Sequence, residues 1–427
     1  MNIAVLLKYK IFHKILKSEF NKNVLILAGG TAVAQAVPVL ISPILTRLYT
    51  PENFGAFAIF VSITSIISAI ACVRYELAII LPAKDEDAIN VAAVAFLFNV
   101  FISTLFLLFI LFFGDWLLGV LNAKNLGWLI YLAPLSVFLM GIFNILNYTN
   151  NRFKLYRDIT VANIYRSMSG ATVQLVLGFF KLEIGLILGQ VFTQIVAVGR
   201  LFKNVRDKFD FSKFNKKNLI IVMYNYKQFP LSLLPIQIFD LIRSYGLNFI
   251  LLYFYGSQNL GLFYLSQRVL QIPLTIISGS ISQVYYQNIV NNEKPYNFTM
   301  QIYKKLLILF LPVFFIIILI PDSFFLLLFG EKWVDIGKII KFLLPWISLN
   351  FFSSFLSFSL IAKNRHKIQT IWSLIYTLLV ICVAIFFTFL DFLDMILVLS
   401  ICIGIFLLVY IFFVLIFLKK LQEEPER

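Results

Sequence analysis

The chain alternates between long apolar runs and short polar segments that are rich in lysine and arginine. An apolar run of about 20 residues is long enough to cross the hydrocarbon core of a bilayer as a helix. The pattern predicts an all-α polytopic membrane protein with twelve transmembrane helices, at 24–46, 54–73, 88–113, 128–148, 159–180, 184–202, 229–252, 259–284, 303–320, 342–362, 368–390 and 394–418.

Composition agrees with this pattern. Of the 427 residues 60% are hydrophobic and 13% charged, whereas about 25% of a soluble protein's residues are charged. The predicted spans leave no room for an extramembrane catalytic domain. The only histidines are His13 and His366, and the three cysteines form no CxxC pair, which argues against a metal site or a catalytic triad. We therefore expect a protein that is not an enzyme and has no cofactor.

The charge distribution predicts an orientation. The chain has 36 Lys and Arg against 21 Asp and Glu. Most of these cations lie in the segments that are cytoplasmic if the N-terminus is inside, and short cytoplasmic loops carry such an excess. We therefore expect both termini in the cytoplasm. Its basic loops would face anionic membrane lipids, and nucleic-acid binding is not implied.

An internal repeat divides the chain. Residues 44–60 align with residues 250–266, which pairs Gly55 with Gly261. Six spans in each half keep both halves in the same orientation, as in parallel repeats. The alignment predicts two six-helix lobes around a central cavity. The expected segments are a basic cytoplasmic N-terminal segment (1–23), an N-lobe (24–202), a basic cytoplasmic linker (203–228), a C-lobe (229–418) and a cytoplasmic tail (419–427).

Polar residues recur every three or four positions inside several spans, so each set lies on one helix face. The clearest set is in the eighth span and consists of Tyr264, Arg268, Gln271, Thr275, Ser278 and Ser282. Such faces either cement helix packing or line a cavity. As cavity-lining residues that contact substrate we expect Arg166, Arg243, Arg268, Gln35, Gln174, Gln237, Gln271, Asn163 and Asn248.

Charged residues inside spans narrow the function. A charge at the bilayer centre costs about 2.5–3.5 kcal/mol on insertion scales, so it usually marks a substrate or ion path. Arg166, Arg243 and Arg268 outnumber the single comparable acid, Asp240. Asp240 and Arg243 could simply neutralise each other on one helix. The other two arginines favour a cationic cavity, and guanidinium groups suit phosphate oxygens, so the expected cargo is anionic.

Arg47, Arg74 and Glu76 lie near span ends. Such side chains often reach the interface simply to remain hydrated. The other interpretation is a role in gating, and it stays open at this point.

Four segments carry a family resemblance: GGTAVAQAVPVLISPILTRLYTPENFGAFAIF (29–60), RYELAIILP (74–82), NYTNNRFKLY (147–156) and YKQFPLSLLP…YLSQRVLQIP (226–273). With them the chain resembles the Wzx-type flippases of O-antigen and polysaccharide repeat units, within the superfamily that also contains multidrug and toxin extruders. The resemblance implies a twelve-helix, two-lobed exporter of the bacterial inner membrane. Such an exporter moves undecaprenyl-diphosphate-linked oligosaccharide from the cytoplasmic to the periplasmic leaflet. A polysaccharide polymerase and a chain-length regulator are the partners that it suggests.

The mechanism expected from residues and resemblance together is alternating access driven by an ion gradient, with Asp240 as the coupling acid. Two other functions remain open. A multidrug or cation antiporter shares the architecture, although cationic substrates call for acids in the cavity. A membrane glycan polymerase or ligase is less favoured, because no predicted outside loop is large.

Overall fold

The computed structural model describes residues 19–206, 216–289, 292, 294–363 and 365–423. Parts of the expected segments 1–23, 203–228 and 419–427 lie outside this range, as does His13. Every regular element in the described residues is helical, which confirms the predicted all-α class. The elements are α2 (Glu19–Leu40), α3 (Ser42–Leu48), α4 (Pro51–Ala71), η1 (Tyr75–Ile80), α5 (Asp85–Val120), η2 (Lys124–Leu132), α6 (Ala133–Arg152), α7 (Tyr156–Phe179), α8 (Gly185–Val205), α9 (Lys216–Asn225), η4 (Phe229–Leu233), α10 (Leu234–Ile289), α11 (Pro295–Leu319), α12 (Asp322–Phe329), η5 (Glu331–Trp333), α13 (Ile336–Ala362), α14 (His366–Phe386) and α15 (Phe392–Glu423).

Ten helical segments of the described chain are long and apolar enough to cross a bilayer, so the protein is a multi-pass membrane protein. One of them, Phe229–Gly279, covers the predicted span 229–252 and most of the predicted span 259–284, and Gly256 lies between these two spans. The φ angle of 79° there ends one helix and begins the next. The predicted span 159–180 is the helix α7, which is not among the ten because Asn163, Arg166 and other polar residues lower its hydropathy. The count of twelve stays a prediction.

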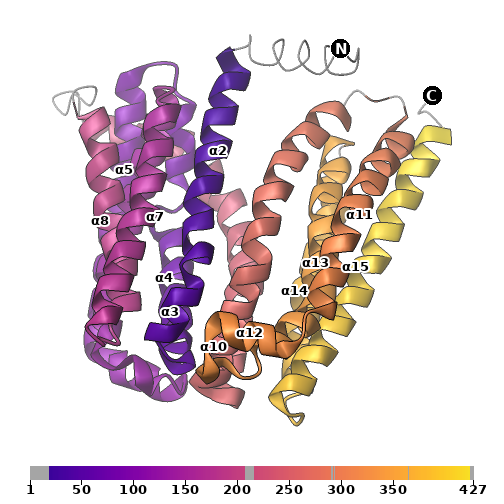
Figure 1. Cartoon of the computed structure of the whole chain (residues 1–427). Coiled ribbons are helices and arrows are strands. Elements are labelled where there is room, and N and C mark those ends of the chain that lie inside the picture. The colour runs from indigo at the N-terminus through magenta and orange to yellow at the C-terminus, as the bar shows by residue number, and fades with distance from the viewer. Residues whose placement is uncertain (1–18, 207–215, 290–291, 293, 364, 424–427) are drawn as a thin grey trace, which may run out of the picture. The chain divides into compact units, whose positions relative to one another are not determined.

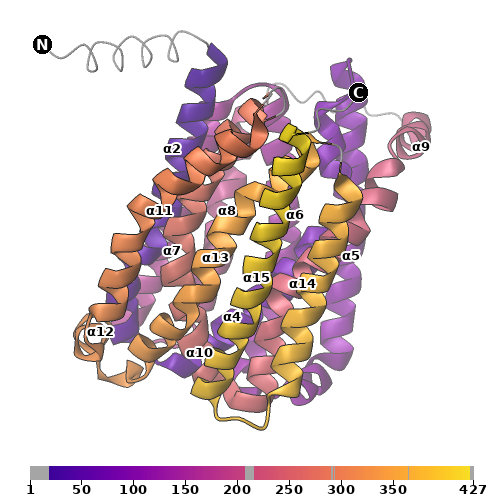
Figure 2. The same cartoon turned by 90° about the vertical axis from the view of Figure 1, so that its right-hand side faces the viewer.

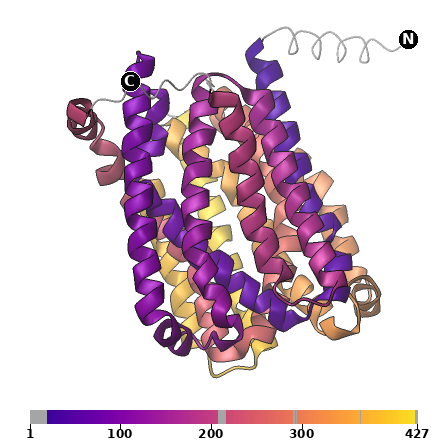
Figure 3. The same ribbon diagram turned by 90° about the vertical axis from the view of Figure 1, so that its left-hand side faces the viewer.

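The contacts within the chain define two units, which are described separately. Unit 1 comprises residues up to 41, 63–116 and 128–238. In it α7 packs along both α2 and α8 (Figures 1 and 3). A Cβ atom on Gly170 of α7 would lie 2.2 Å from Cγ2 of Thr193 on α8. Small residues thus let these helices approach closely, which is how helices associate in lipid.

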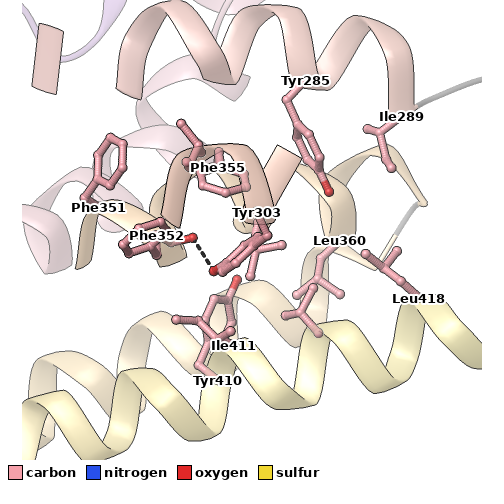
Figure 4. Packing of buried hydrophobic residues seen from close by; sticks show 13 residues of the cluster. Tyr285, Ile289, Tyr303, Phe351, Phe352, Phe355, Leu360, Tyr410, Ile411 and Leu418 are labelled. Carbon is pink, nitrogen blue, oxygen red and sulfur yellow. Dashed lines mark hydrogen bonds between the residues drawn. The ribbon is translucent and has the colours of Figure 1, made fainter. Parts of the chain in front are cut away.

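Unit 2 comprises residues 42–62, 117–127 and 239–427. Here α13 packs against α11, α14 and α15 (Figure 2). An aromatic cluster fills the space between these helices and the end of α10 (Figure 4). Its buried hydroxyl groups are satisfied, since Tyr303 donates to the carbonyl oxygen of Phe352 at 2.8 Å and Tyr285 bonds Thr299 at 2.8 Å. The cluster therefore packs these helices together while the hydroxyl groups of Tyr285 and Tyr303 keep hydrogen-bond partners.

The units differ in extent from the expected lobes 24–202 and 229–418, because residues 42–62 contact the C-terminal helices. Trp333 is fully buried, and its Nε1 donates to the carbonyl oxygen of Thr46 in α3 at 2.9 Å. Its ring stands edge-on to Phe54 of α4, with 5.1 Å between the ring centroids. The start of α4 thus belongs to the core of unit 2. The lobe boundaries stay a prediction.

Candidate functional site

Unit 2 contains a cavity of about 670 Å³, a volume typical of a small-molecule site. Its walls come from α10, α13, α14 and α15, with Val61 of α4. Many of the side chains that line it are polar or aromatic, among them Tyr264, Gln267, Arg268, Gln271, Asn350, Ser353, Gln369, Trp372, Tyr376 and Tyr410. Polar walls on membrane-spanning helices indicate a water-accessible site.

The cavity is cationic. Arg243 and Arg268 are among its described lining residues, which include no Asp or Glu. In the described part of the chain, Nη1 of Arg268 is buried and has no hydrogen-bond partner. A buried donor of a charged group that lacks a partner is costly, and an anion in the cavity would supply one. Arg268 is therefore the group in this cavity that is best placed to bind an anion.

Three members of the predicted eighth-span stripe line the cavity, namely Tyr264, Arg268 and Gln271. The ring of Tyr264 also meets Phe57 of α4 edge-on, with centroids 5.8 Å apart. Thr275 and Ser278, further along the same face, do not line the cavity, and their hydroxyl groups donate to backbone carbonyls of their own helix. The site therefore uses only part of the stripe.

Arg243 lies in the cavity wall but is engaged by other groups. Its Nη2 lies 2.9 Å from Oδ1 of Asp240, and its Nη1 donates to Oγ of Ser373 at 3.1 Å. Its guanidinium carbon lies 5.5 Å from the ring centroid of Tyr376. Arg243 thus joins α10 to α14, and the pairing with Asp240 that the sequence left open is present.

The two amide residues predicted in the seventh span, Asn248 and Gln237, lie in different units, and only Asn248 lines the cavity. Asn248 lines the cavity, and its Nδ2 donates to Oγ of Ser62 at 2.9 Å, so it also joins α10 to α4. Gln237 is half-buried, belongs to unit 1 and is not among the residues that line the cavity.

The cavity is also lined by polar faces of two helices that the sequence analysis did not single out. On α14 they are Gln369, Trp372, Ser373 and Tyr376, and on α13 they are Trp346, Asn350, Ser353, Ser354 and Ser357. Both sets have helical spacing, which was the available signal. Several of these groups are already fixed, since Nε1 of Trp346 donates to the Tyr376 hydroxyl at 2.9 Å and the Tyr410 hydroxyl donates to Gln369 at 2.6 Å.

The remaining predicted cavity residues lie in unit 1. The guanidinium carbon of Arg166 lies 4.4 Å from the ring centroid of Phe143. Gln174 is buried, and its Nε2 donates to the carbonyl oxygen of Leu186 at 3.2 Å, which is a packing contact. Gln35 is exposed on α2, and Asn163 is half-buried on α7. Their contact with a substrate stays a prediction.

Arg47 has a structural partner. Its Nη2 donates to the carbonyl oxygen of Leu327 at 3.0 Å. This carbonyl belongs to the last turn of α12, where helices leave carbonyl groups without intrahelical partners. A cation at that end also interacts favourably with the helix dipole. Arg47 thus ties α3 to α12 within unit 2.

Arg74 and Glu76 form a pair in unit 1, with 3.5 Å between Nη1 and Oε1. Arg74 adopts a left-handed backbone conformation with φ of 65° and precedes η1. Glu76 is only 3% exposed. Burial raises the pKa of its carboxyl group above the ordinary value, while a hydrogen bond from its own backbone and the nearby Arg74 act in the opposite direction.

Arg152, which the sequence analysis did not select, organises the adjoining loop. Its Nη1 donates to the carbonyl oxygens of Ile79 at 3.2 Å and Pro82 at 2.7 Å, and its Nη2 bonds Asp85 at 2.8 Å. The NYTNNRFKLY segment contains this residue and RYELAIILP precedes Asp85, so two of the segments that carried the resemblance meet here.

Among the described residues, no group of three or more His, Cys, Asp or Glu is arranged to hold a metal ion. The site is thus a cavity lined by arginine, amide, hydroxyl and aromatic groups. Such groups bind and orient an anionic or polyhydroxylated molecule.

Comparison with solved structures shows the fold. The lipid II flippase MurJ, in an inward closed conformation, has a TM-score of 0.67 and 14% identity, and the match covers 91% of this chain and 87% of that chain. An inward-facing multidrug resistance MATE family transporter of the MOP superfamily has a TM-score of 0.63 and 17% identity over 95% and 96% of the two chains. A MOP superfamily transporter from Pyrococcus furiosus, described by the reverse polarity of its binding pocket, has a TM-score of 0.61 and 15% identity over 97% and 98%.

No curated protein sequence matches the chain. A family model described as "Polysaccharide biosynthesis protein" matches residues 44–338, which is more than half of the chain. The protein is therefore a membrane protein of the polysaccharide biosynthesis protein family with the fold of MOP superfamily transporters and flippases.

Proposed function

We propose that the chain is a flippase for undecaprenyl-diphosphate-linked oligosaccharide repeat units of the O-antigen or capsule type. It would move them from the cytoplasmic to the periplasmic leaflet of a bacterial inner membrane by alternating access, with both termini in the cytoplasm. Anionic membrane lipids would contact its basic loops, and a polysaccharide polymerase and a chain-length regulator would act on the exported units.

The observation that supports this proposal best is the cationic cavity of unit 2. Its described lining contains two arginines and no carboxylate, and one buried guanidinium nitrogen of Arg268 lacks a partner. Amide and hydroxyl groups such as Asn350 and Ser353 surround the arginines. A diphosphate needs the arginines, and a sugar needs the amides and hydroxyl groups.

The cavity would lower the main barrier to flipping, which is the loss of hydration of the polar head group. A sugar diphosphate loses its hydration in hydrocarbon, and the cost is several kcal/mol for each unsatisfied polar group and more for each charge. Side chains in the cavity replace water as hydrogen-bond partners for the head group. The polyprenyl chain is apolar and needs no such replacement, so it can remain in lipid.

A deletion strain tests the direction of transport. We expect lipid-linked repeat units to accumulate on the cytoplasmic side of the inner membrane, where periplasmic glycan-cleaving enzymes cannot reach them. Accumulation of exported but unpolymerised units would instead indicate a polymerase or ligase. Export of cationic dyes in place of any glycan defect would indicate a multidrug transporter.

Single substitutions test the cavity. Arg268→Ala should lower surface glycan by roughly tenfold to a hundredfold at normal protein level, because a charge-assisted hydrogen bond contributes about 1.5–3 kcal/mol. Arg268→Lys should retain part of the display, since it keeps the charge but not the bidentate geometry. Lys338 is a matched control: it is an exposed cation of unit 2, paired with Asp335 at 3.1 Å and outside the cavity. Full display with Arg268→Ala would contradict the proposed role of the cavity.

A further inference from the structure

Glu76 is a buried carboxylate that does not line the proposed substrate cavity. It lies in η1, between α4 and α5, and is 3% exposed. Its neighbours in chain and space include the buried apolar cluster of Cys72, Ala78 and Ile79. An ionised carboxylate in such surroundings is unfavourable unless it is fully paired and hydrogen-bonded.

The pairing of Glu76 is incomplete. Oε1 lies 3.5 Å from Nη1 of Arg74, which is longer than the 2.7–2.9 Å of a charge-assisted hydrogen bond. Oε2 is buried, and within the described residues it has no hydrogen-bond partner. Nε of Arg74 is also buried and, among the described residues, also has no hydrogen-bond partner. The ionised form is thus only partly compensated, so the neutral carboxyl group competes with it.

The groups around this carboxylate come from several elements of unit 1. Besides Arg74, Cys72 just after α4 and Tyr148 of α6 interact with it electrostatically. Arg152 of α6 is engaged by backbone carbonyls of the loop and by Asp85.

The helices α9 and η4 present apolar groups to this cluster, including Val222 and Phe229. Tyr75 of η1 directs its hydroxyl to the carbonyl oxygen of Met223, at 3.1 Å. Of the described charged residues, Arg74 alone is paired with Glu76.

Asp240, the acid that the sequence analysis selected for ion coupling, is placed differently. It is half-exposed, and its Oδ1 lies 2.9 Å from Nη2 of Arg243. Asp240 thus has a short ion pair and reaches solvent, whereas Glu76 is buried and only incompletely paired. Of the two acids, Glu76 therefore has the surroundings of a group that gains and loses a proton.

We propose that Glu76 is a proton-binding site and that it, rather than Asp240, couples proton movement to transport. The first part stands on the surroundings of the carboxylate alone, and the coupling rests on the proposed flippase function. The proton passes from water to Oε2 and returns to water. Arg74, whose side chain is 22% exposed, marks the side from which water reaches the pair.

The position of Glu76 gives its charge a structural consequence. The ionised carboxylate attracts Arg74 and holds the strained turn that precedes η1. The neutral carboxyl group releases Arg74. Because Tyr75 in the same turn bonds the backbone of α9, the change in charge acts where α9 contacts η1 within unit 1.

Difference infrared spectroscopy of the purified full chain in lipid, titrated with pH, tests the proton site without any substrate. A protonated-carboxyl band should disappear at a pH above the ordinary range of glutamate. The band should be absent in Glu76→Gln and unchanged in the control Asp240→Asn. A band that persists in Glu76→Gln, or disappears in Asp240→Asn, would overturn the proposal.

Cells that depend on the surface glycan test the coupling. Glu76→Gln should lower glycan display at normal protein level, and Glu76→Asp should restore part of it. Normal display with Glu76→Gln would overturn the coupling. A deletion strain without cytoplasmic accumulation of repeat units would instead reject the flippase function and leave the infrared result intact.

Discussion

Gly55 and Gly261 face each other where two helices cross backbone to backbone. A Cβ atom on Gly261 would lie 1.8 Å from the carbonyl oxygen of Pro51 and 3.0 Å from the backbone nitrogen of Gly55. A Cβ atom on Gly55 would lie 2.0 Å from the carbonyl oxygen of Ser257. Side chains are thus excluded from both positions, and the start of α4 lies directly on the helix that follows Gly256.

The same two glycines are paired by the internal alignment of residues 44–60 with 250–266. Positions that correspond in the alignment therefore meet in space. Oγ of Ser257 adds a hydrogen bond of 3.0 Å to the carbonyl oxygen of Glu52. Close backbone approach with hydroxyl contacts is the ordinary means of helix association in lipid.

Gly261→Ala should destabilise the protein by about 1–3 kcal/mol, the usual range for overpacking, because the nearest neighbours of the new methyl group are backbone atoms that cannot rotate away. We expect a lower midpoint of thermal unfolding and a reduced yield of monodisperse protein. Gly119→Ala is the matched control, since nothing lies within 4 Å of its Cβ position. Equal behaviour of the two variants would show that the crossing tolerates a methyl group.

The sequence predicted those features that depend on periodicity along one helix. Tyr264, Arg268 and Gln271 line the cavity as their spacing of three and four indicated. The break between the seventh and eighth spans falls at Gly256, between the predicted boundaries. Serine in a span packs helices as readily as it lines a cavity, so the face of α13 at Ser353 could not be distinguished from a packing face.

Features that depend on contacts between distant segments were not predictable from spacing. The donation from Asn248 to Ser62 and the carbonyl partner of Gln174 depend on which helices meet. Residues 42–62 join unit 2 because of the crossing at Gly55, and a hydropathy pattern contains no information on such a crossing. Burial likewise distinguishes Glu76 from Asp240, although both are acids beside an arginine.

The two cavity arginines should differ in their effect on stability. Arg243→Ala removes an ion pair, a hydrogen bond and a ring contact, and it should lower the free energy of unfolding by about 1 kcal/mol, the upper value for partly exposed pairs. Arg268→Ala should leave stability unchanged or slightly higher, because it removes a buried donor that lacks a partner. Thermal unfolding of the purified variants measures both. A larger loss for Arg268→Ala than for Arg243→Ala would contradict this assignment.

Trp333→Phe should destabilise unit 2 through one hydrogen bond. The phenyl ring retains most of the apolar contact with Phe54 but leaves the Thr46 carbonyl without its donor, at a cost of about 1–3 kcal/mol. The midpoint of unfolding should fall accordingly. Trp128→Phe, at a side chain that is 59% exposed, should leave the midpoint unchanged. If both tryptophans tolerate the change equally, the bond to Thr46 contributes nothing.

Arg74→Gln should move the titration of Glu76 to higher pH. Burial raises the pKa of the Glu76 carboxyl group and Arg74 lowers it, so removal of the guanidinium leaves burial less opposed. A carboxyl group with a raised pKa binds its proton more tightly in the folded chain than in the unfolded chain. Its contribution to stability is thus complete below the ordinary pKa of glutamate and is lost as the pH rises through the folded value.

Thermal unfolding followed across pH measures this dependence. Arg74→Gln should show the loss of stability extending to higher pH than in the wild type, and Glu76→Gln should abolish this component. Arg74→Lys is the matched control, because it keeps the charge and meets the same left-handed backbone conformation, with φ of 65°. A shift of the titration to lower pH in Arg74→Gln would mean that Arg74 does not stabilise the ionised carboxylate, and the 3.5 Å pair would then have no electrostatic role.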